Sequence, residues 1–510
     1  MKINVNEVQT QLSSENGQIQ EAMTSTYDLT STINQYTGNT MLQGATYNGF
    51  CDMFNNVTKP LIKAVLCMLE AKYDGNTTYA RALEQNLAGM GKVDVDALRS
   101  SIETSQSKVS DMTSNSVVEF VASPYIAVLE KLITTSQEKL DKIEAFIAQT
   151  NGCYEEFDTQ NSLVLQGINC ARNISFNEGT GNVNGINYFG YDWVDKVNEY
   201  YTHKTYEEIR EKYGDYCKDN KEDIYKIKQV VEYERFHRGD AEKVNEFLGR
   251  LETKDVIGIK AVAYAADPLY RSLWIKYLDR YEIAVVAGDD AYYTSKYDKI
   301  VLDPTIYRDE DYLTFFHECG HAVDRYSGDR GPIKELLSIK YTSQTFTSAD
   351  GQTLDQAIES DVKAYIGVQV ATTIASKGYK MSDTQRNEVT ENIINNIMSG
   401  GETPLSGGEE KIANEIKINF NQNARGITNS LVSDVYGGTT NAELQGSYGH
   451  DESYWFNEDG SRRMTPCREY VAEYFAYGMT KHKAGMQSVE TYLGGSKEVM
   501  DSMLETMGKQ

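Results

Sequence analysis

The chain has 510 residues, of which 40% are hydrophobic and 25% charged, with 7 prolines, so it can form two or three ordered domains with a buried core. Its formal net charge of -25 and its pI of about 4.8 make nucleic acids and anionic membranes unfavourable default partners, because this field repels phosphate. The 7 cysteines include no CxxC pair, which argues against a disulfide framework and for small core residues.

No stretch of the sequence approaches the roughly 20 apolar residues that a membrane-spanning helix needs. The most apolar early segment, 60–71, is short and contains Lys63 and Glu70. The N-terminus also lacks the apolar segment of a cleaved signal peptide. We therefore expect a protein that is made in the cytoplasm and either stays there or leaves by a route that does not read such a signal.

Residues 1–172 are predicted to be helical. Thr58 is a predicted cap with Pro60 in the first turn of its helix, and Ser123 is a predicted cap with Pro124 at the first helical position. Long amphipathic helices of this kind must pack on each other or on a partner. The two apolar stripes at 3.6-residue spacing are Leu61, Ile62, Val65, Leu66 and Leu69, and Leu129, Leu132, Ile133, Leu140, Ile143 and Ile147.

The pattern changes after this helical part. Glycine and asparagine residues in 173–190 indicate a linker or a hairpin, and a charged helical stretch follows. Two β-branched runs, 282–288 and 298–303, predict strands of a small sheet. The next predicted helix has Asp309 as its cap and Gly328 just past its end.

This helix contains the sequence HECGH, in which His317 and His321 are four residues apart. Residues at this spacing share one helix face, so both imidazoles can bind the same Zn²⁺ ion, as in HExxH proteases. Zinc lowers the pKa of a bound water toward about 7, and Glu318 can accept its proton during attack on a peptide carbonyl. The alternative is that both histidines are structural and have satisfied side chains.

A catalytic zinc needs a third protein ligand. Asp324 and Ser327 stand where a metzincin has glycine and histidine, and Glu335 lacks the flanking pattern of a thermolysin-like ligand. Glu469 and Glu473, four apart on another predicted helix, are better candidates than Glu335: one can bind zinc while the other accepts a hydrogen bond from a ligand histidine. Asp324 is expected to support the ligands in the same way. The alternative for the pair is two solvated surface glutamates.

The segments HECGHAVDRYSG and EYVAEYFA resemble the zinc-helix and glutamate-helix motifs of the anthrax-lethal-factor-like metalloendopeptidases, a gluzincin group. The resemblance is firm in these two motif helices. It implies a zincin-like fold, one Zn²⁺ bound by His317, His321 and Glu469, Glu318 as general base, and Glu473 as hydrogen-bond support for a ligand.

Two features depart from the pattern of this family. The separation of His321 from Glu469 is much longer than in the lethal factor, so the helical block at 350–440 is expected to be an inserted lid or specificity domain. Arg462 stands seven residues before Glu469, where the family often has a transition-state tyrosine. The segment GSYGHDESYW, which resembles part of lethal-factor-like domains in bacterial polymorphic toxins, offers three groups that could stabilise the oxyanion: Tyr448, His450 and Tyr454.

The stretch 41–71 resembles the LXG domain of toxins that are exported by the type VII (ESX-like) pathway, with Leu42-Gln43-Gly44 as the namesake triplet. The triplet alone is not specific, because it recurs at 165–167 and 444–446. Its position and helical context carry the resemblance. They imply signal-peptide-independent secretion, small helical secretion partners on the N-terminal helices, and an immunity protein in the producing bacterium.

Together, these features predict a mainly α protein with an N-terminal long-helix bundle or hairpin and a C-terminal α+β zincin-like domain with a small sheet and a large helical insertion. The predicted parts are an LXG-like domain (1–172), a linker with connecting helices (173–235) and a metalloprotease domain (236–510). The predicted function is that of a secreted zinc endopeptidase toxin, whose peptide or protein substrate lies antiparallel to an edge strand near 291–302. The alternatives are an intracellular or phage-derived processing protease and a non-enzymatic interaction protein with a metal-stabilised domain.

Overall fold

The structure is a computed structural model, and it describes residues 1–509 except 39–41, 115, 178–179, 181, 189, 289, 329–340, 425–429, 447–449, 451 and 457–464. The described part is mainly α-helical, with small sheets of two or three strands, which confirms the predicted fold class. The chain forms two compact units, Met1–Ile224 with Val231–Gly239 and Tyr225–Val230 with Asp240–Gln510.

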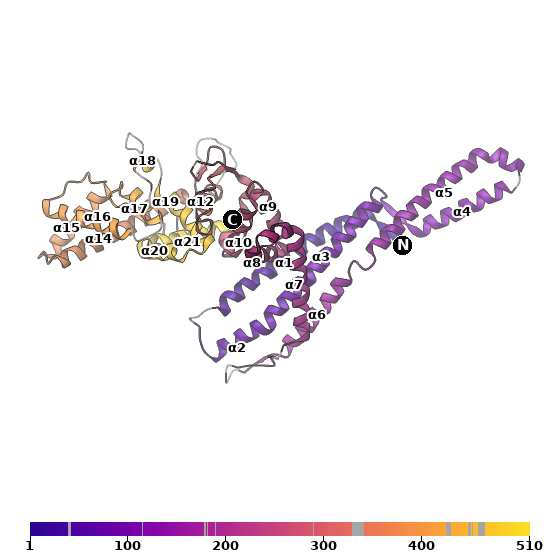
Figure 1. Cartoon of the computed structure of the whole chain (residues 1–510), viewed down its shortest axis with the longest axis horizontal. Coiled ribbons are helices and arrows are strands. Elements are labelled where there is room, and N and C mark those ends of the chain that lie inside the picture. Colours follow the sequence, from indigo (N-terminus) through magenta and orange to yellow (C-terminus); the bar gives the residue numbers. More distant parts are fainter. Residues whose placement is uncertain are drawn as a thin grey trace. The chain divides into compact units, whose positions relative to one another are not determined.

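The first unit consists of long helices, drawn in indigo to magenta in Figure 1. Two short antiparallel strand pairs, β1 with β2 and β3 with β4, accompany the helices. The elements in chain order are β1 (Lys2–Asn4), α1 (Val5–Thr37), α2 (Ala45–Met53), η1 (Phe54–Thr58), α3 (Lys59–Leu87), β2 (Lys92–Asp94), α4 (Val95–Thr113), α5 (Ser116–Thr150), α6 (Glu155–Arg172), β3 (Ser175–Phe176), β4 (Val183–Asn184), α7 (Asp192–Asp219), η2 (Lys221–Asp223) and α8 (Ile224–Phe236).

Helix α3 is central to this unit, because α1, α5, α6 and α7 all pack on it. Its predicted stripe faces the core: Ile62 and Leu66 are buried, and the other three residues of the stripe are half-buried. Trp193 and Val197 of α7 belong to the same core. Part of the segment 173–235, which was expected to connect two domains, therefore lies in the interior of the first unit.

Two predicted helix caps are wrong, although α3 does begin at Lys59, directly after Thr58. Thr58 has helical dihedral angles (φ -69°, ψ -48°) and lies in η1, a π-helical turn that joins α2 to α3 without a break. Lys59 follows this wider turn, and the next residue is Pro60, which has no N–H to donate. Ser123 and Pro124 lie inside α5, which begins at Ser116. A capping pattern shows where a helix can begin, but it does not prevent helical residues from preceding it.

Helices α4 and α5 run side by side as a hairpin (Figure 1). In the apolar stripe of α5, Leu129, Leu140 and Ile143 are buried, but Leu132 and Ile147 are each 45% exposed. The stripe is therefore only partly packed within the unit, since one neighbouring helix covers only part of the surface of another.

The glycine-rich segment after α6 contains a short antiparallel hairpin, so of the two alternatives, linker or hairpin, the described residues show a hairpin. Ser175 pairs with Asn184, and Phe176 pairs with Val183. The ring of Phe176 stacks on Phe50 of α2, with 5.4 Å between the centroids. This aromatic contact holds the hairpin against the helices.

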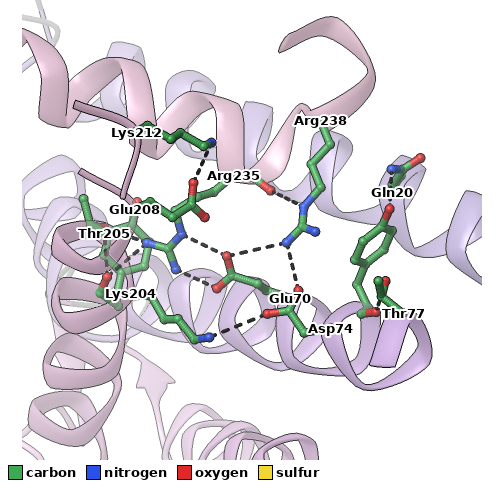
Figure 2. Close-up of polar contacts among 12 residues, drawn as sticks. Gln20, Glu70, Asp74, Thr77, Lys204, Thr205, Glu208, Lys212, Arg235 and Arg238 are labelled. Carbon is green, nitrogen blue, oxygen red and sulfur yellow. Dashed lines mark hydrogen bonds and ion pairs between the residues drawn. The ribbon is translucent and has the colours of Figure 1, made fainter. Parts of the chain in front are cut away.

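A buried ion pair joins three helices of the first unit (Figure 2). Arg235 of α8 donates two hydrogen bonds to the carboxylate of Glu70 on α3, at 2.9 and 2.6 Å, and both residues are 1% exposed. The remaining nitrogen of Arg235 donates to the carbonyl of Tyr201 and the hydroxyl of Thr205, both on α7. Every polar group of the pair thus has a partner, which a buried charge requires.

A shell of further charges surrounds this pair, as Figure 2 shows. Arg238 lies 3.2 Å from Asp74, and Lys204 lies 3.6 Å from the same carboxylate. Lys212 donates to Glu208 at 2.8 Å. These outer pairs are partly exposed and contribute little each, so the Glu70–Arg235 pair is the energetically important contact of the group.

The second unit contains the predicted zinc helix and the small sheet. Its elements in chain order are α9 (Arg238–Leu248), α10 (Thr253–Ala265), α11 (Pro268–Lys276), η3 (Leu278–Arg280), β5 (Glu282–Val285), β6 (Tyr292–Thr294), β7 (Lys299–Leu302), η4 (Glu310–Tyr312), α12 (Leu313–Ser327), α13 (Thr342–Thr345), α14 (Leu354–Ser376), α15 (Asp383–Met398), α16 (Gly407–Ala424), α17 (Ser430–Thr439), α18 (Glu452–Trp455), α19 (Pro466–Thr480), α20 (Lys483–Tyr492) and α21 (Gly494–Lys509).

Both predicted strands are present in a three-stranded sheet of order β5-β7-β6, in which β5 is parallel and β6 antiparallel to the central β7. Helix α12 follows, as the sequence predicted. Asp309 accepts hydrogen bonds from the backbone N–H and the hydroxyl of Thr314, at 2.9 and 2.6 Å, so it caps the first turn. Gly328 comes directly after the last helical residue. Phe315 and Phe316 are fully buried on the core side.

Helices α12 and α19 pack closely against each other. A Cβ atom at Gly320 of α12 would lie only 2.7 Å from the backbone of Ala472 on α19, so glycine is required for this approach. The helical block between these two helices packs on the same core, with α14 and α17 both in contact with α19.

All seven cysteines are free thiols. Cys67, Cys319 and Cys467 are buried, and the other four are half-buried. Within the described residues, no helix combines the length and the apolar character that crossing a bilayer requires.

The buried ion pair predicts that substitutions at two glutamates of α3 change stability by very different amounts. Glu70→Gln should destabilise the first unit by about 3–5 kcal/mol, because it leaves the Arg235 cation buried without a counter-charge. Glu84→Gln, at an exposed position of the same helix, should change stability by less than about 0.5 kcal/mol. Native-state hydrogen exchange of the α3 backbone amides measures the stability of the first unit in the full-length variants. Equal protection in both variants would contradict the assignment.

Candidate metal centre

Two helices bring three possible metal ligands to one point. His317 and His321 lie one turn apart on α12, and Glu469 lies in the first turn of α19. One ligand atom of each residue lies within 4.8 Å of the other two. Among the residues that the structure describes, no other group of three His, Cys, Asp or Glu side chains has this geometry.

The distances in this group fit a tetrahedral ion. The Nε2 atoms of His317 and His321 lie 3.4 and 3.5 Å from the two carboxylate oxygens of Glu469. Two ligands at about 2.0–2.1 Å from a tetrahedral zinc are roughly 3.4 Å apart, so the spacing suits this ion. The Oε2 atom of Glu469 is also buried with no hydrogen-bond partner in the described part of the chain. A buried oxygen of this kind is an available ligand atom.

Glu473 supports the group from the next turn of α19. The Nδ1 atom of His317 donates to Glu473 Oε2 at 2.6 Å, and Tyr477 donates to the other oxygen at 2.9 Å. This hydrogen bond leaves the Nε2 atom of His317 free to face Glu469. Glu469 and Glu473 therefore occupy two different positions, as their spacing suggested: Glu469 lies near the two Nε2 atoms, and Glu473 lies behind His317.

The charged groups of the cluster shift each other's pKa in opposite directions. Burial lowers the pKa of His317, but the contacts with Glu469 and Glu473 outweigh burial and raise it well above its ordinary value. Burial raises the pKa of Glu469, but His321 and His317 outweigh burial and lower it well below its ordinary value. The buried carboxylate thus depends on a neighbouring positive charge, which a proton or a metal ion can supply.

Glu318 faces the same cavity as the three ligand residues. Its side chain is nearly buried, and burial raises its pKa above the ordinary value of 4.5, although His317 and His321 act in the opposite direction. A carboxylate with a raised pKa accepts protons more readily near neutral pH. The sequence-predicted base therefore lies where a proton acceptor is needed.

The site cavity has a volume of about 490 Å³, and residues 291–296, which include β6, form one of its walls. One side of β6 pairs with β7, and the described residues place no strand on the other side. Arg325 of α12 holds this wall in place, because it donates to the Tyr293 hydroxyl at 2.8 Å and to the Ser295 carbonyl at 2.6 Å. The free edge can accept an extended peptide beside Glu318.

Two of the three candidates for oxyanion stabilisation line this cavity, whereas Tyr448 lies outside the described residues. The hydroxyl of Tyr454 donates to Glu469 Oε1, and its ring stacks on His450 with 3.7 Å between centroids. Burial and the Glu469 carboxylate raise the pKa of Tyr454, so its phenol remains a hydrogen-bond donor at neutral pH. The structure leaves Tyr454 and His450 both as candidates.

His450 is held by a buried aspartate that the sequence analysis missed. Asp434 of α17 accepts hydrogen bonds from the backbone N–H of His450 at 2.6 Å and from its ring Nδ1 at 3.0 Å. Burial lowers the pKa of His450, but Asp434 outweighs burial and raises it above 6.5. No local pattern connects Asp434 with the zinc motif, because α17 reaches the site only by packing on α19. The helical block that was expected to be a lid or a specificity domain therefore contributes Asp434 to the site itself.

Asp324 was expected to support the ligand residues, but the hydrogen bonds of its carboxylate go to Ser343 instead. Its carboxylate accepts hydrogen bonds from the backbone N–H and the hydroxyl of Ser343, at 2.7 and 2.6 Å. The Nδ1 atom of His321 has no hydrogen-bond partner among the described residues. The physical reason is that the free N–H groups at the start of α13 attract an anion, so Asp324 anchors this short helix to α12.

Neither cysteine near the motifs belongs to the ligand group. Cys319 is fully buried, and burial raises the pKa of its thiol to about 12. Cys467 is also buried, and its thiol donates to Thr465 at 3.3 Å. Glu335 and Arg462 lie outside the described residues.

Comparisons of the chain with protein-family models, with curated proteins and with solved structures find no match. The resemblances to the lethal-factor-like and LXG families therefore stay predictions.

The burial of Asp324 predicts a specific pH dependence of stability. Burial raises its pKa from the ordinary 3.8 to about 6, so between these values the folded protein holds a proton that the unfolded chain has lost. This group therefore makes stability fall by up to about 3 kcal/mol as pH rises through that window. Asp324→Asn, which keeps an acceptor for the Ser343 N–H, should remove this part of the slope.

Urea unfolding of wild type and Asp324→Asn at pH 4, 5, 6 and 7 measures the difference between the two slopes. The variant should gain stability relative to wild type as pH rises. A difference that is constant across the four pH values would show that the Asp324 carboxyl group does not titrate in this window.

Proposed function

We propose that this protein is a zinc-dependent endopeptidase whose active site is the cavity between α12, α19 and β6. One observation supports the proposal above all others: three ligand side chains converge within 4.8 Å and share a cavity with the Glu318 carboxylate. A structural zinc site is usually closed by four protein ligands, whereas a catalytic site keeps an open position. The described residues offer three ligands, which fits a catalytic site.

Zinc bound by the three ligands would supply Lewis-acid activation of water and of the peptide carbonyl. The side chains of the protein carry out the proton transfers. Glu318 accepts a proton from the attacking water and delivers it to the leaving amine. Tyr454 or His450 donates a hydrogen bond to the carbonyl oxygen as negative charge develops there. The free edge of β6 aligns the substrate as an antiparallel strand.

For the N-terminal unit, the proposal rests on the LXG resemblance. We propose that this unit directs secretion by a type VII (ESX-like) pathway and that small helical partner proteins bind its helices. The chain would then be a secreted toxin, with an immunity protein in the producing cell. Gly44 of the triplet precedes α2 with φ +115° and ψ 166°, a conformation that strongly favours glycine. This gives a physical reason for the glycine, but it is no evidence about export.

The two alternatives differ from this proposal in what they require. An intracellular or phage-derived processing protease would use the same active site, and secretion that depends on an ESX-like system separates it from a toxin. A non-enzymatic interaction protein with a metal-stabilised domain would need neither the buried Glu318 in the cavity nor an open ligand position.

One prediction from the proposed function distinguishes residues that bind zinc from the residue that acts as general base. Wild type should bind about one zinc per chain, and Glu318→Gln should keep it but lower the rate of peptide hydrolysis by at least about 100-fold, because the general base is lost. Glu469→Ala should lose most of the zinc, since only two protein ligands remain. Zinc content by plasma mass spectrometry and cleavage of a degenerate peptide library measure both effects.

Glu490→Ala, an exposed substitution outside the cavity, serves as the control and should match wild type in both assays. Undiminished hydrolysis by Glu318→Gln would refute the proposed base. Zinc retained by Glu469→Ala would place the third ligand elsewhere. A wild-type protein that holds no zinc would favour the interaction-protein alternative.

A second prediction identifies the oxyanion donor. The variant that removes the donor, Tyr454→Phe or His450→Gln, should lower kcat by about 100-fold or more with little change in KM and in zinc affinity. If Tyr454 only supports Glu469, Tyr454→Phe should instead weaken zinc binding about 10- to 100-fold. Steady-state kinetics and competition with a zinc chelator distinguish the two roles. If neither variant changes kcat, both candidates are excluded.

A further inference from the structure

Arg468 is a cation in the site cavity that the proposed mechanism does not use. It immediately precedes Glu469 on α19 and lines the same cavity. Its side chain is half-buried, and within the described residues it forms no ion pair, although its charge lowers the pKa of the buried Asp324 carboxyl group. Its Nε atom is buried there without a hydrogen-bond partner. Guanidinium groups in such positions are generally paired, so this side chain has donors to offer to a ligand.

An aromatic ring fixes the position of this guanidinium. Its central carbon lies 3.8 Å from the centroid of the Tyr341 ring, and Tyr341 is only 6% exposed. Tyr341 directly precedes α13, which Asp324 anchors to the zinc helix through Ser343. The stacked guanidinium is therefore a preorganised donor fork, the geometry that binds carboxylates with two hydrogen bonds.

The carboxylates of the cavity already have other partners. Glu469 faces the two histidines and accepts a hydrogen bond from Tyr454. Glu318 lies beside the same histidines, which act on its pKa. Of the other basic groups that line the cavity, His450 is paired with Asp434, whereas Lys296 is exposed beside β6. Arg468 and Lys296 are thus the positive charges in the cavity lining that remain to bind a substrate.

We propose that Arg468 determines substrate specificity by binding a carboxylate of the peptide close to the bond that is cleaved. This inference rests on the proposed peptidase function and adds the class of substrate: peptides with an acidic group near the cleavage site. The carboxylate belongs either to an Asp or Glu side chain or to the C-terminus of the peptide. The net charge of -25 does not prevent this, because charges beyond a Debye length of about 8 Å are largely screened at physiological salt.

The test begins with the cleavage sites that wild type selects from a degenerate peptide library. Matched peptides are then made from the best site, with Glu against Gln at each flanking position and with a free acid against an amide at the C-terminus. The ratio of kcat/KM between acid and amide should be at least about tenfold at one position. A preference at an internal position indicates a side-chain carboxylate, and a preference at the terminus indicates the C-terminal one.

Arg468→Gln should reduce this ratio to near one, mainly by slowing cleavage of the acidic peptide by about 10- to 100-fold. Arg468→Lys, which keeps the charge but not the fork, should retain part of the ratio. Arg468→Glu should shift the preference toward a Lys-containing peptide. Lys380→Gln, an exposed position outside the cavity, changes the net charge by the same amount and should leave the ratio unchanged.

Binding provides a readout that does not depend on turnover. In a Glu318→Gln background, fluorescence anisotropy with the labelled acidic peptide and its amide partner should show the same preference, and Arg468→Gln should abolish it. If wild type cleaves peptides without an acid preference, or if Arg468→Gln and Arg468→Lys both keep that preference, this inference fails while the peptidase proposal stands. If wild type cleaves no peptide, the peptidase proposal fails and this inference falls with it.

Discussion

The site depends on one contact, the close approach of α12 and α19 at Gly320 and Ala472. Gly320 lies between the two histidines of its helix, and Ala472 lies between the two glutamates of the other. Because a Cβ at position 320 would lie 2.7 Å from the opposite backbone, a larger residue there would force the helices apart. The spacing of 3.4 and 3.5 Å between the imidazoles and Glu469 would then be lost. The two motifs therefore encode both the ligands and the contact that assembles them.

In each unit, a buried carboxylate lies against a cation and accepts hydrogen bonds from that residue. Glu70 faces Arg235 in the first unit, and Asp434 faces His450 in the second. This pairing is needed because an unpartnered charge in the interior costs several kcal/mol. Arg468 forms no ion pair among the described residues, although its charge lowers the pKa of Asp324, and its Nε atom has no hydrogen-bond partner there. A substrate carboxylate would supply that partner.

Local patterns failed where packing outweighs them. The capping signals at Thr58 and Ser123 were genuine sequence patterns, yet the helices extend through both positions because the preceding residues are also helical. Asp324 was expected to support a histidine, but the free N–H groups of α13 offer its carboxylate better donors. The errors at Thr58 and Ser123 come from the adjacent helical residues. The error at Asp324 comes from a partner distant in sequence, which periodicity within one window does not reveal.

The sequence by itself determined the fold class, the two strands before α12, the pairing of His317 with His321 on one face, and the pair Glu469 and Glu473 on another helix. These features depend on spacings of a few residues, which helix and strand geometry translate directly into faces. Only the tertiary structure decided that Glu469 rather than Glu473 faces the two histidines, that Asp434 holds His450, and that Tyr341 orients Arg468. Those relations join segments far apart in the chain, and they exist only where packed helices bring them together.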